Sequence, residues 1–199
     1  MLFSDKSSNT FVFRRTGIGR FTGTLADKVG ATGHVTAVEF MPNFSAQNEA
    51  ANAQRANTSF ICEDVCKLDP LVEAGSVDVI FINWLLMYLG DEEVAAFASH
   101  ALRWLAPGGS LFFRESCVQQ SGNAKRAFNP THYRDPAEYS ATFAGAGGPF
   151  EERAGAEEDV HRFHLERMQP SEVYRVQKGN ANQMTFLWTK VSAASCAAS

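Results

Sequence analysis

Residues 76–89, SVDVIFINWLLMYL, constrain the fold more than any other stretch of the chain. The first half is apolar apart from Asp78, and a run rich in Val, Ile and Phe is typical of a strand buried on both faces of a parallel sheet. Asn83 follows where this strand should end, and ligands of open α/β sheets bind beyond the carboxyl ends of the strands. Asn83 and Trp84 therefore either form a pocket wall or, in the alternative interpretation, begin a turn and fill the core.

The segments on either side of this stretch alternate between two kinds of periodicity. Short apolar runs predict strands, and apolar residues three and four positions apart predict helices. The expected strands lie at residues 10–14, 34–40, 58–62, 77–82 and 110–117, and the expected helices at 22–29, 43–55 and 91–105. This alternation predicts an α/β fold with a doubly wound, mostly parallel sheet and helices on both faces.

After residue 117 the pattern changes. Residues 119–139 are polar, basic and aromatic, and such donors suit a phosphate group, although an ordinary solvated loop is the alternative. Residues 141–158 are rich in Gly, Ala and Glu and predict a mobile surface excursion. Segments 161–168 and 183–191 predict a closing pair of strands, and the low-complexity tail 192–199 is expected to be disordered.

Composition narrows the class of protein. The 199 residues suit one domain, and a net charge of −4 argues against non-specific binding of nucleic acid. Cys62 and Cys66 have neither a second close pair nor a nearby His, so we expect no metal site but free thiols in a reducing compartment. No apolar run reaches the roughly 18–20 residues of a membrane span, and no signal region is evident. We therefore expect a cytoplasmic location.

Polar residues stand at three successive strand ends, namely Glu39, Asp64 and Asn83. The glycine turn at 16–21 precedes them, and such a turn lets backbone N–H groups approach a ligand. An acidic residue at the end of the second strand commonly accepts hydrogen bonds from ribose hydroxyls, and the alternative for Glu39 is a solvent-facing side chain. The combination favours a nucleoside-binding edge.

A set of motifs matches one known family. They are TGIGRFTGTLA, AVEF, EDV, FINWLLMYLGDEEV, WLAPGGSLFFRESC, QQSGNAKR, NPTHYRDP and FLWTKV. Together they resemble the phosphoethanolamine N-methyltransferases, most closely the first methyltransferase domain of the plant-type members, over about residues 10–191. The resemblance implies a Rossmann-like class I methyltransferase fold that binds S-adenosyl-L-methionine and methylates the amine of phosphoethanolamine toward phosphocholine.

The resemblance also implies the domain organisation and the site residues. Residues 1–191 would form a single methyltransferase domain that lacks the family's N-terminal helices, with a second methyltransferase domain expected in a longer parent chain. The cofactor contacts would fall on Gly17, Gly19, Arg20, Glu39, Asp64, Val65 and Asn83. The phosphobase site would map onto Ser116, Ser121, Gly122, Arg126 and Tyr133, with Arg134 and Tyr139 as neighbours.

Three positions depart from the family pattern. Phe13 stands where the family has an acid, Arg15 where it has the first glycine, and Gln119 where plant-type members have a His. His132 is the remaining candidate for the general base, and the alternative is a structural histidine in its loop. Two other functions stay open: a non-catalytic domain that binds phosphobase or a partner, and a different methyl acceptor on the same fold.

Overall fold

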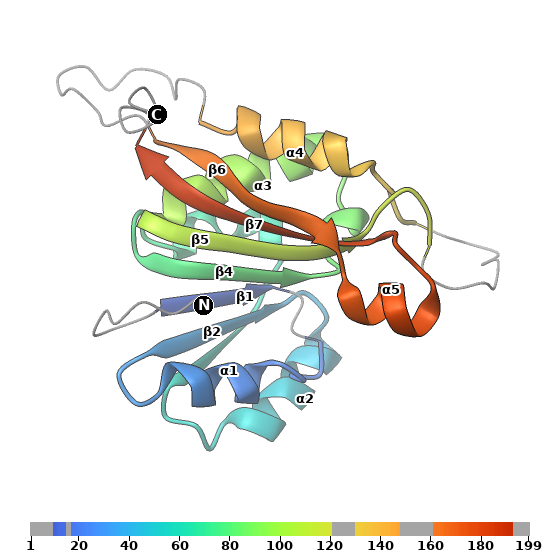
Figure 1. Cartoon of the computed structure of the whole chain (residues 1–199). Coiled ribbons are helices and arrows are strands. Elements are labelled where there is room, and N and C mark those ends of the chain that lie inside the picture. Colours follow the sequence, from blue (N-terminus) through green and yellow to red (C-terminus); the bar gives the residue numbers. More distant parts are fainter. Residues whose placement is uncertain (1–9, 15–16, 121–129, 148–160, 193–199) are drawn as a thin grey trace, which may run out of the picture.

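The computed structural model describes residues 10–14, 17–120, 130–147 and 161–192. Within them the chain forms a seven-stranded sheet in the order β3-β2-β1-β4-β5-β7-β6 (Figure 1). The first five strands are parallel, whereas β7 runs antiparallel to both β5 and β6. The strands are β1 (Thr10–Arg14), β2 (His34–Glu39), β3 (Thr58–Cys62), β4 (Val77–Asn83), β5 (Leu105–Ser116), β6 (His161–Pro170) and β7 (Gln183–Ser192). The predicted mostly parallel sheet is confirmed.

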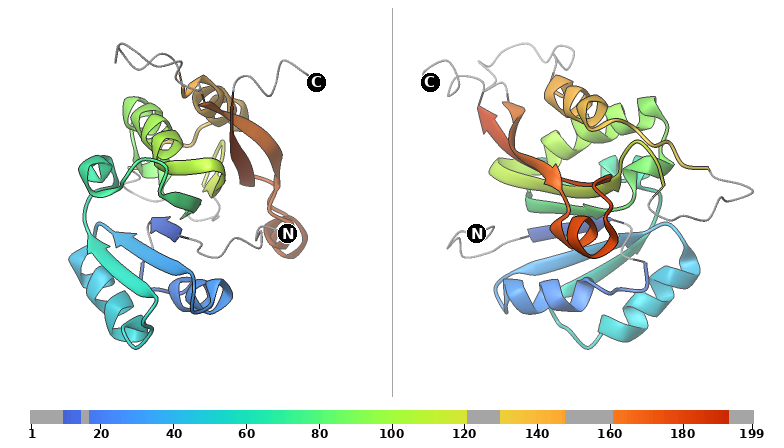
Figure 2. Two further views of the ribbon diagram at one scale, coloured as in Figure 1. Left: turned by 90° about the vertical axis from the view of Figure 1, so that its left-hand side faces the viewer. Right: turned by 45° about the vertical axis from the view of Figure 1, so that its right-hand side comes forward.

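Helices flank the sheet in two groups. The chain leaves β1 toward β2 and β3 on one side and continues through β4 and β5 on the other. Because parallel crossovers are right-handed, this reversal places the helices of the two halves on opposite faces. Figure 2 shows α3 and α4 together, away from α1 and α2. The helices are α1 (Thr22–Val29), α2 (Pro42–Asn52), α3 (Asp91–Trp104), α4 (Pro136–Gly145) and α5 (Glu172–Lys178), with short 3₁₀ turns η1 (Val65–Lys67), η2 (Asp69–Leu71) and η3 (Leu86–Tyr88).

The main core lies between α3, α4 and the centre of the sheet. Phe113 of β5 stacks on Phe186 of β7 with ring centroids 4.4 Å apart, and Phe143 of α4 lies 4.9 Å from Phe113. All three side chains are fully buried, as is Trp104 at the end of α3. Among the described residues, no helix has both the length and the apolar content needed to cross a membrane.

The region after β5 differs from the expectation. A surface excursion was expected from residue 141, but α4 occupies Pro136–Gly145 and buries Tyr139 and Phe143 completely. The helix begins at a capping box, in which Asp135 accepts from the Ala137 N–H and Glu138 accepts from the Asp135 N–H. Pro136 at the first helical position supports the same start.

Other element boundaries also shift. The strand expected from residue 110 already begins at Leu105, so Pro107 lies inside β5 and α3 ends before it. Helix α5 falls between the two closing strands and was not expected. Ser192, expected in the tail, is the last residue of β7, and residues 193–199 lie outside the described part of the chain.

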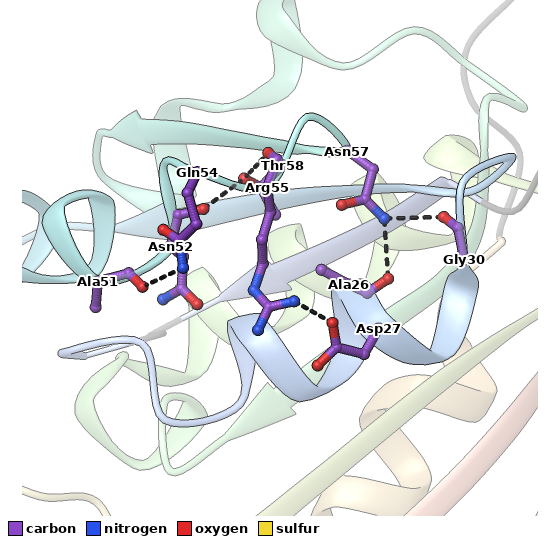
Figure 3. Close-up of polar contacts among 9 residues, drawn as sticks. All are labelled: Ala26, Asp27, Gly30, Ala51, Asn52, Gln54, Arg55, Asn57 and Thr58. Atoms are coloured by element: carbon purple, nitrogen blue, oxygen red, sulfur yellow. Dashed lines mark hydrogen bonds and ion pairs between the residues drawn. The ribbon is translucent and has the colours of Figure 1, made fainter.

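The segment before β3 is bound to the end of α1, as Figure 3 shows. The side-chain amide of Asn57 donates to the carbonyl oxygens of Ala26 and Gly30, both at 2.9 Å. Ala26 lies in the last turn of α1 and Gly30 is its C-cap residue, so their carbonyls are at the helix end, where intrahelical donors run out. Arg55 adds an ion pair with Asp27 of the same helix. The contacts fix α1 against the first half of the sheet.

Replacing Asn57 with Ala should lower the free energy of unfolding by about 1–2 kcal/mol, because two carbonyl oxygens lose their donor. Urea denaturation monitored by circular dichroism measures the change. Gln54→Ala is the matched control, since the exposed Gln54 side chain makes one hydrogen bond to its own helix-end carbonyl at Ala51. Equal stability of the two variants would contradict the assigned role of Asn57.

Candidate functional site

The carboxyl ends of β2, β3 and β4 lie on one edge of the sheet, because these strands are parallel. A cavity of about 400 Å³ lies at this edge. Four carboxylates line it, together with apolar side chains from the turn after β4. The carboxylates are Glu39, Glu63, Asp64 and Glu93. A concave site with this excess of negative charge favours a cationic ligand.

Glu39 joins the glycine turn to the end of β2. Its side chain is 4% exposed, and its two carboxylate oxygens accept from the backbone N–H groups of Gly17 at 2.9 Å and Met41 at 3.0 Å. Gly17 has a φ of 53°, and an added Cβ there would meet no atom within 4 Å. Glu39 is therefore a buried, oriented acceptor next to open space.

Asp64 and Val65 form the adjoining part of the cavity wall. The Asp64 carboxylate accepts from the Cys66 N–H at 3.0 Å and so begins η1, which leaves the buried Val65 at the wall. The other predicted cofactor residues lie outside the lining. Gly19 packs against Asn48 of α2, so an added Cβ would collide with that side chain, and Arg20 is exposed.

Asn83 lies at the same edge but bonds away from the cavity wall. Its side-chain oxygen accepts from Arg114 Nε at 2.8 Å. Trp84 follows with a φ of 55°, and its backbone N–H donates to the Arg114 carbonyl at 2.9 Å. The indole N–H donates to Gln183 at 2.7 Å. Trp84 thus forms a half-buried contact with β5 and β7.

The turn after β4 is held from both sides. From β5, one oxygen of the buried Glu115 accepts from the N–H groups of Leu85 and Leu86, both at 2.7 Å. From the other side, Arg134 donates to the carbonyl oxygens of Leu86 at 2.9 Å and Leu89 at 2.6 Å. Leu85 and Leu89 line the cavity, so these bonds fix its wall.

The predicted phosphobase residues separate into groups. Ser116 is 3% exposed and accepts from the Gln183 side-chain amide at 2.7 Å. Tyr133 is half-buried in the segment just before α4. His132 is exposed, and its backbone N–H donates to the Met87 carbonyl at 2.7 Å. Ser121, Gly122 and Arg126 lie outside the described residues.

Two of the predicted substrate neighbours take structural positions instead. The Arg134 guanidinium, 8% exposed, is occupied by the carbonyls of the turn and by Asp91 at 2.7 Å. Tyr139 is fully buried, with its ring 5.6 Å from that of Phe113. Burial raises the pKa of Tyr139, and so does the nearby charge of Glu115. Both side chains are therefore engaged by the protein itself, and their position beside the substrate stays a prediction.

Several site residues were not assigned from the sequence. Arg114 and Glu115 follow an apolar strand, and their alternation in β5 sends them to opposite faces of the sheet. This alternation was a usable signal, since two charged residues at the end of a central strand need partners. Gln183, which links Trp84 to Ser116, had no such signal because it begins a strand distant in sequence.

Arg134→Met should lower the free energy of unfolding by about 3 kcal/mol, because the Leu86 and Leu89 carbonyls and Asp91 lose a charged donor. Urea unfolding measures the loss, and hydrogen exchange at residues 86–90 should accelerate. Arg175→Met is the control, since among the described residues that exposed arginine pairs only with the exposed Glu172 three residues before it, and its loss should change stability little. Unchanged hydrogen exchange in the turn would show that Arg134 does not hold it in place.

The buried thiol of Cys117, which directly follows β5, should make the folded protein less stable at alkaline pH. Burial, aided by the charges of Glu115 and Asp135, raises its pKa from 9.0 to about 12. The folded state therefore keeps a proton that the unfolded state releases, so stability should fall as pH rises from about 9 toward 12. Comparing urea unfolding of the wild type and Cys117→Ala between pH 8 and 10.5 isolates this contribution. Parallel pH profiles would contradict it.

Comparison with known proteins agrees with this geometry. Residues 16–109 match the model of a family described as a methyltransferase domain. A phosphoethanolamine N-methyltransferase of Triticum aestivum is 43% identical over 176 residues, which are 88% of this chain and 33% of the relative. Phosphoethanolamine N-methyltransferase 1 of Arabidopsis thaliana is 42% identical over 182 residues, which are 88% of this chain and 34% of the relative. The chain thus spans about a third of the length of these relatives.

Solved structures give the same result. Phosphoethanolamine N-methyltransferase 1 of Haemonchus contortus, in complex with phosphoethanolamine and S-adenosylhomocysteine, superposes with a TM-score of 0.82 at 31% identity over 96% of this chain and 41% of that protein. A SAM-dependent methyltransferase of Methanosarcina mazei has a TM-score of 0.69 at 14% identity over 94% of both chains, which shows the shared fold. The chain has the class I methyltransferase fold, and over 88% of its length it is similar to the phosphoethanolamine N-methyltransferases.

Proposed function

We propose that this chain is a methyltransferase domain that transfers a methyl group from S-adenosyl-L-methionine to the amine of phosphoethanolamine, toward phosphocholine. The observation that carries the proposal is the buried Glu39 carboxylate, placed between the glycine turn and an acid-lined cavity. The names of the relatives and the ligands of the Haemonchus contortus structure support the acceptor and the cofactor.

The cavity residues fit this cofactor. Glu39 would accept hydrogen bonds from the ribose hydroxyls, and Asp64 and Val65 would hold the adenine beside η1. The volume of about 400 Å³ and the open side of Gly17 leave room for a nucleoside. The surrounding carboxylates suit the positive charge of a sulfonium. When bound, the cofactor supplies an activated methyl group on positively charged sulfur.

The remaining requirements fall on the protein. Methyl transfer is a displacement, so holding the amine in line with the methyl group supplies much of the rate. The amine must be neutral to attack, and a base within hydrogen-bond reach would take its proton. We propose His132 for this role, because its backbone is fixed to Met87 in the turn that carries the cavity wall. Binding the phosphate, remote from the nitrogen, orients the nucleophile.

Two further parts of the proposal rest on the sequence. A cytoplasmic location is supported by the cysteine pattern, in which Cys62 and Cys66 have no second close pair. A second methyltransferase domain in a longer parent chain is supported by the resemblance to the plant-type members.

Glu39→Gln should weaken binding of S-adenosylhomocysteine at least tenfold, or about 1.4 kcal/mol, because a neutral amide replaces the buried acceptor. Binding of phosphocholine should stay within about twofold. Isothermal titration calorimetry measures both affinities. Glu49→Gln, the same charge change on an exposed face of α2, is the control and should leave both unchanged.

The wild-type titrations separate the alternatives. Binding of both ligands, with transfer of methyl groups to phosphoethanolamine, is the expected result. Phosphocholine binding without S-adenosylhomocysteine binding would favour a non-catalytic domain. Methyl transfer to another amine alone would favour a different acceptor on the same fold.

A further inference from the structure

Arg114 lies at the carboxyl end of β5 and has no part in the function described so far. Its Nε donates to Asn83 at 2.8 Å, and its guanidinium lies 4.5 Å from the ring centroid of Trp84 and 5.4 Å from that of Tyr174. The two rings meet edge to face at 6.0 Å. Helix α5, which carries Tyr174, lies beside the ends of β4 and β5 in Figures 1 and 2. Three elements therefore orient one cation.

The described part of the protein does not use the terminal nitrogens of this guanidinium. Within the described ranges, Arg114 makes one side-chain hydrogen bond, through Nε, and neither Nη1 nor Nη2 has an acceptor. Arg134 shows the contrast, since its terminal nitrogens are consumed by carbonyls and a carboxylate. An oriented guanidinium with free terminal donors matches the geometry of a phosphate or carboxylate.

Burial makes an anion favourable at this position. Desolvation lowers the pKa of Arg114, although Tyr174 and Glu115 raise it in part. A cation that has lost part of its hydration gains more from a bound anion than an exposed one does. Within the described residues, the carboxylates of the cavity lie with β2, β3 and the start of α3, whereas this cation lies on β5.

The sheet order sets the separation of these charges. Strands β1 and β4 lie between β2 and β5, so Glu39 and Arg114 are three strand spacings apart, or about 14 Å. A ligand that carries a positive or neutral nitrogen at one end and a phosphate at the other would place its nitrogen toward the cavity and its phosphate toward Arg114. The reverse orientation would place a phosphate among four carboxylates.

We propose that Arg114, oriented by Asn83, Trp84 and Tyr174, binds the phosphate of a phosphorylated amine and so determines specificity for phosphorylated over free amines. The inference rests on the proposed function and names a residue of its acceptor site. Arg114 supplies a rigid, partly desolvated donor pair on the sheet itself.

The test compares Arg114→Met and Arg114→Lys with the wild type. Titration calorimetry uses phosphocholine, inorganic phosphate and choline, with S-adenosylhomocysteine as the second-site probe. Arg114→Met should raise the Kd for phosphocholine and for phosphate at least tenfold, and leave the Kd for S-adenosylhomocysteine within twofold. The Kd of Arg114→Lys for phosphocholine should lie between those of the wild type and Arg114→Met, because lysine keeps the charge but lacks the planar, two-donor geometry of the guanidinium. Any weak binding of choline should be equal in all three proteins.

Two controls keep the result interpretable. Arg175→Met removes an exposed arginine of α5 that pairs with Glu172, and it should bind phosphocholine like the wild type. Thermal unfolding shows whether each variant is folded. If the methionine variant does not fold, the lysine variant, which keeps a cation at this position, still tests the role of the planar guanidinium. In turnover, loss of Arg114 should raise KM for phosphoethanolamine more than it lowers kcat, whereas a purely structural role would weaken both ligand sites together.

The outcomes distinguish this inference from the function on which it rests. Phosphocholine affinity within twofold of wild type in a folded Arg114→Met variant overturns the inference and leaves the methyltransferase function intact. Arg114-dependent phosphate binding by a wild type that does not bind S-adenosylhomocysteine supports the inference and overturns the function. A wild type that binds neither phosphate nor phosphocholine overturns the inference.

Discussion

The buried carboxylate of Glu115 is the contact on which the site depends. A carboxylate without exposure to water costs free energy unless it is hydrogen-bonded, and here one of its oxygens accepts from the N–H groups of both Leu85 and Leu86. Because Glu115 belongs to β5 and its donors follow β4, the bond fixes the path of the chain beyond the sheet. The same turn supplies the cavity wall on one side and Trp84, with its positive φ, on the other.

Contacts from distant parts of the chain complete this arrangement. Arg134 holds the far side of the turn, and the Val118 N–H donates to the Arg134 carbonyl at 3.1 Å, which joins the end of β5 to the same segment. Gln183 links Trp84 to Ser116 through one side-chain amide. A displacement of any one of these groups would leave a buried polar atom without its partner, so the edge of the sheet is expected to move as a unit.

The sequence was informative where one physical signal dominated. Apolar periodicity gave the bounds of α1 and β3, and the strand-end rule brought Glu39 and Asp64 to one cavity. Helix α4 was missed because glycine and alanine dominated the composition, although Asp135 and Glu138 already formed a capping box. The side on which a loop residue lies follows from tertiary packing, and no local pattern encodes it. The sequence therefore did not predict that Arg134 holds the turn after β4 or that Tyr139 lies in the core.

The distribution of charge along the sheet edge gives a physical basis for acceptor choice. Four carboxylates at the ends of β2 and β3 and the start of α3 create a negative potential that favours a sulfonium and disfavours a phosphate in the same place. The cation on β5 is partly desolvated, and its attraction for an anion is screened less by salt than that of a surface arginine. In the proposed site, these opposite fields would orient an amine that carries its phosphate two carbons away, with its nitrogen toward the cavity and its phosphate toward Arg114. Under this proposal, selection of the acceptor rests on electrostatic orientation by a cation held on a rigid strand.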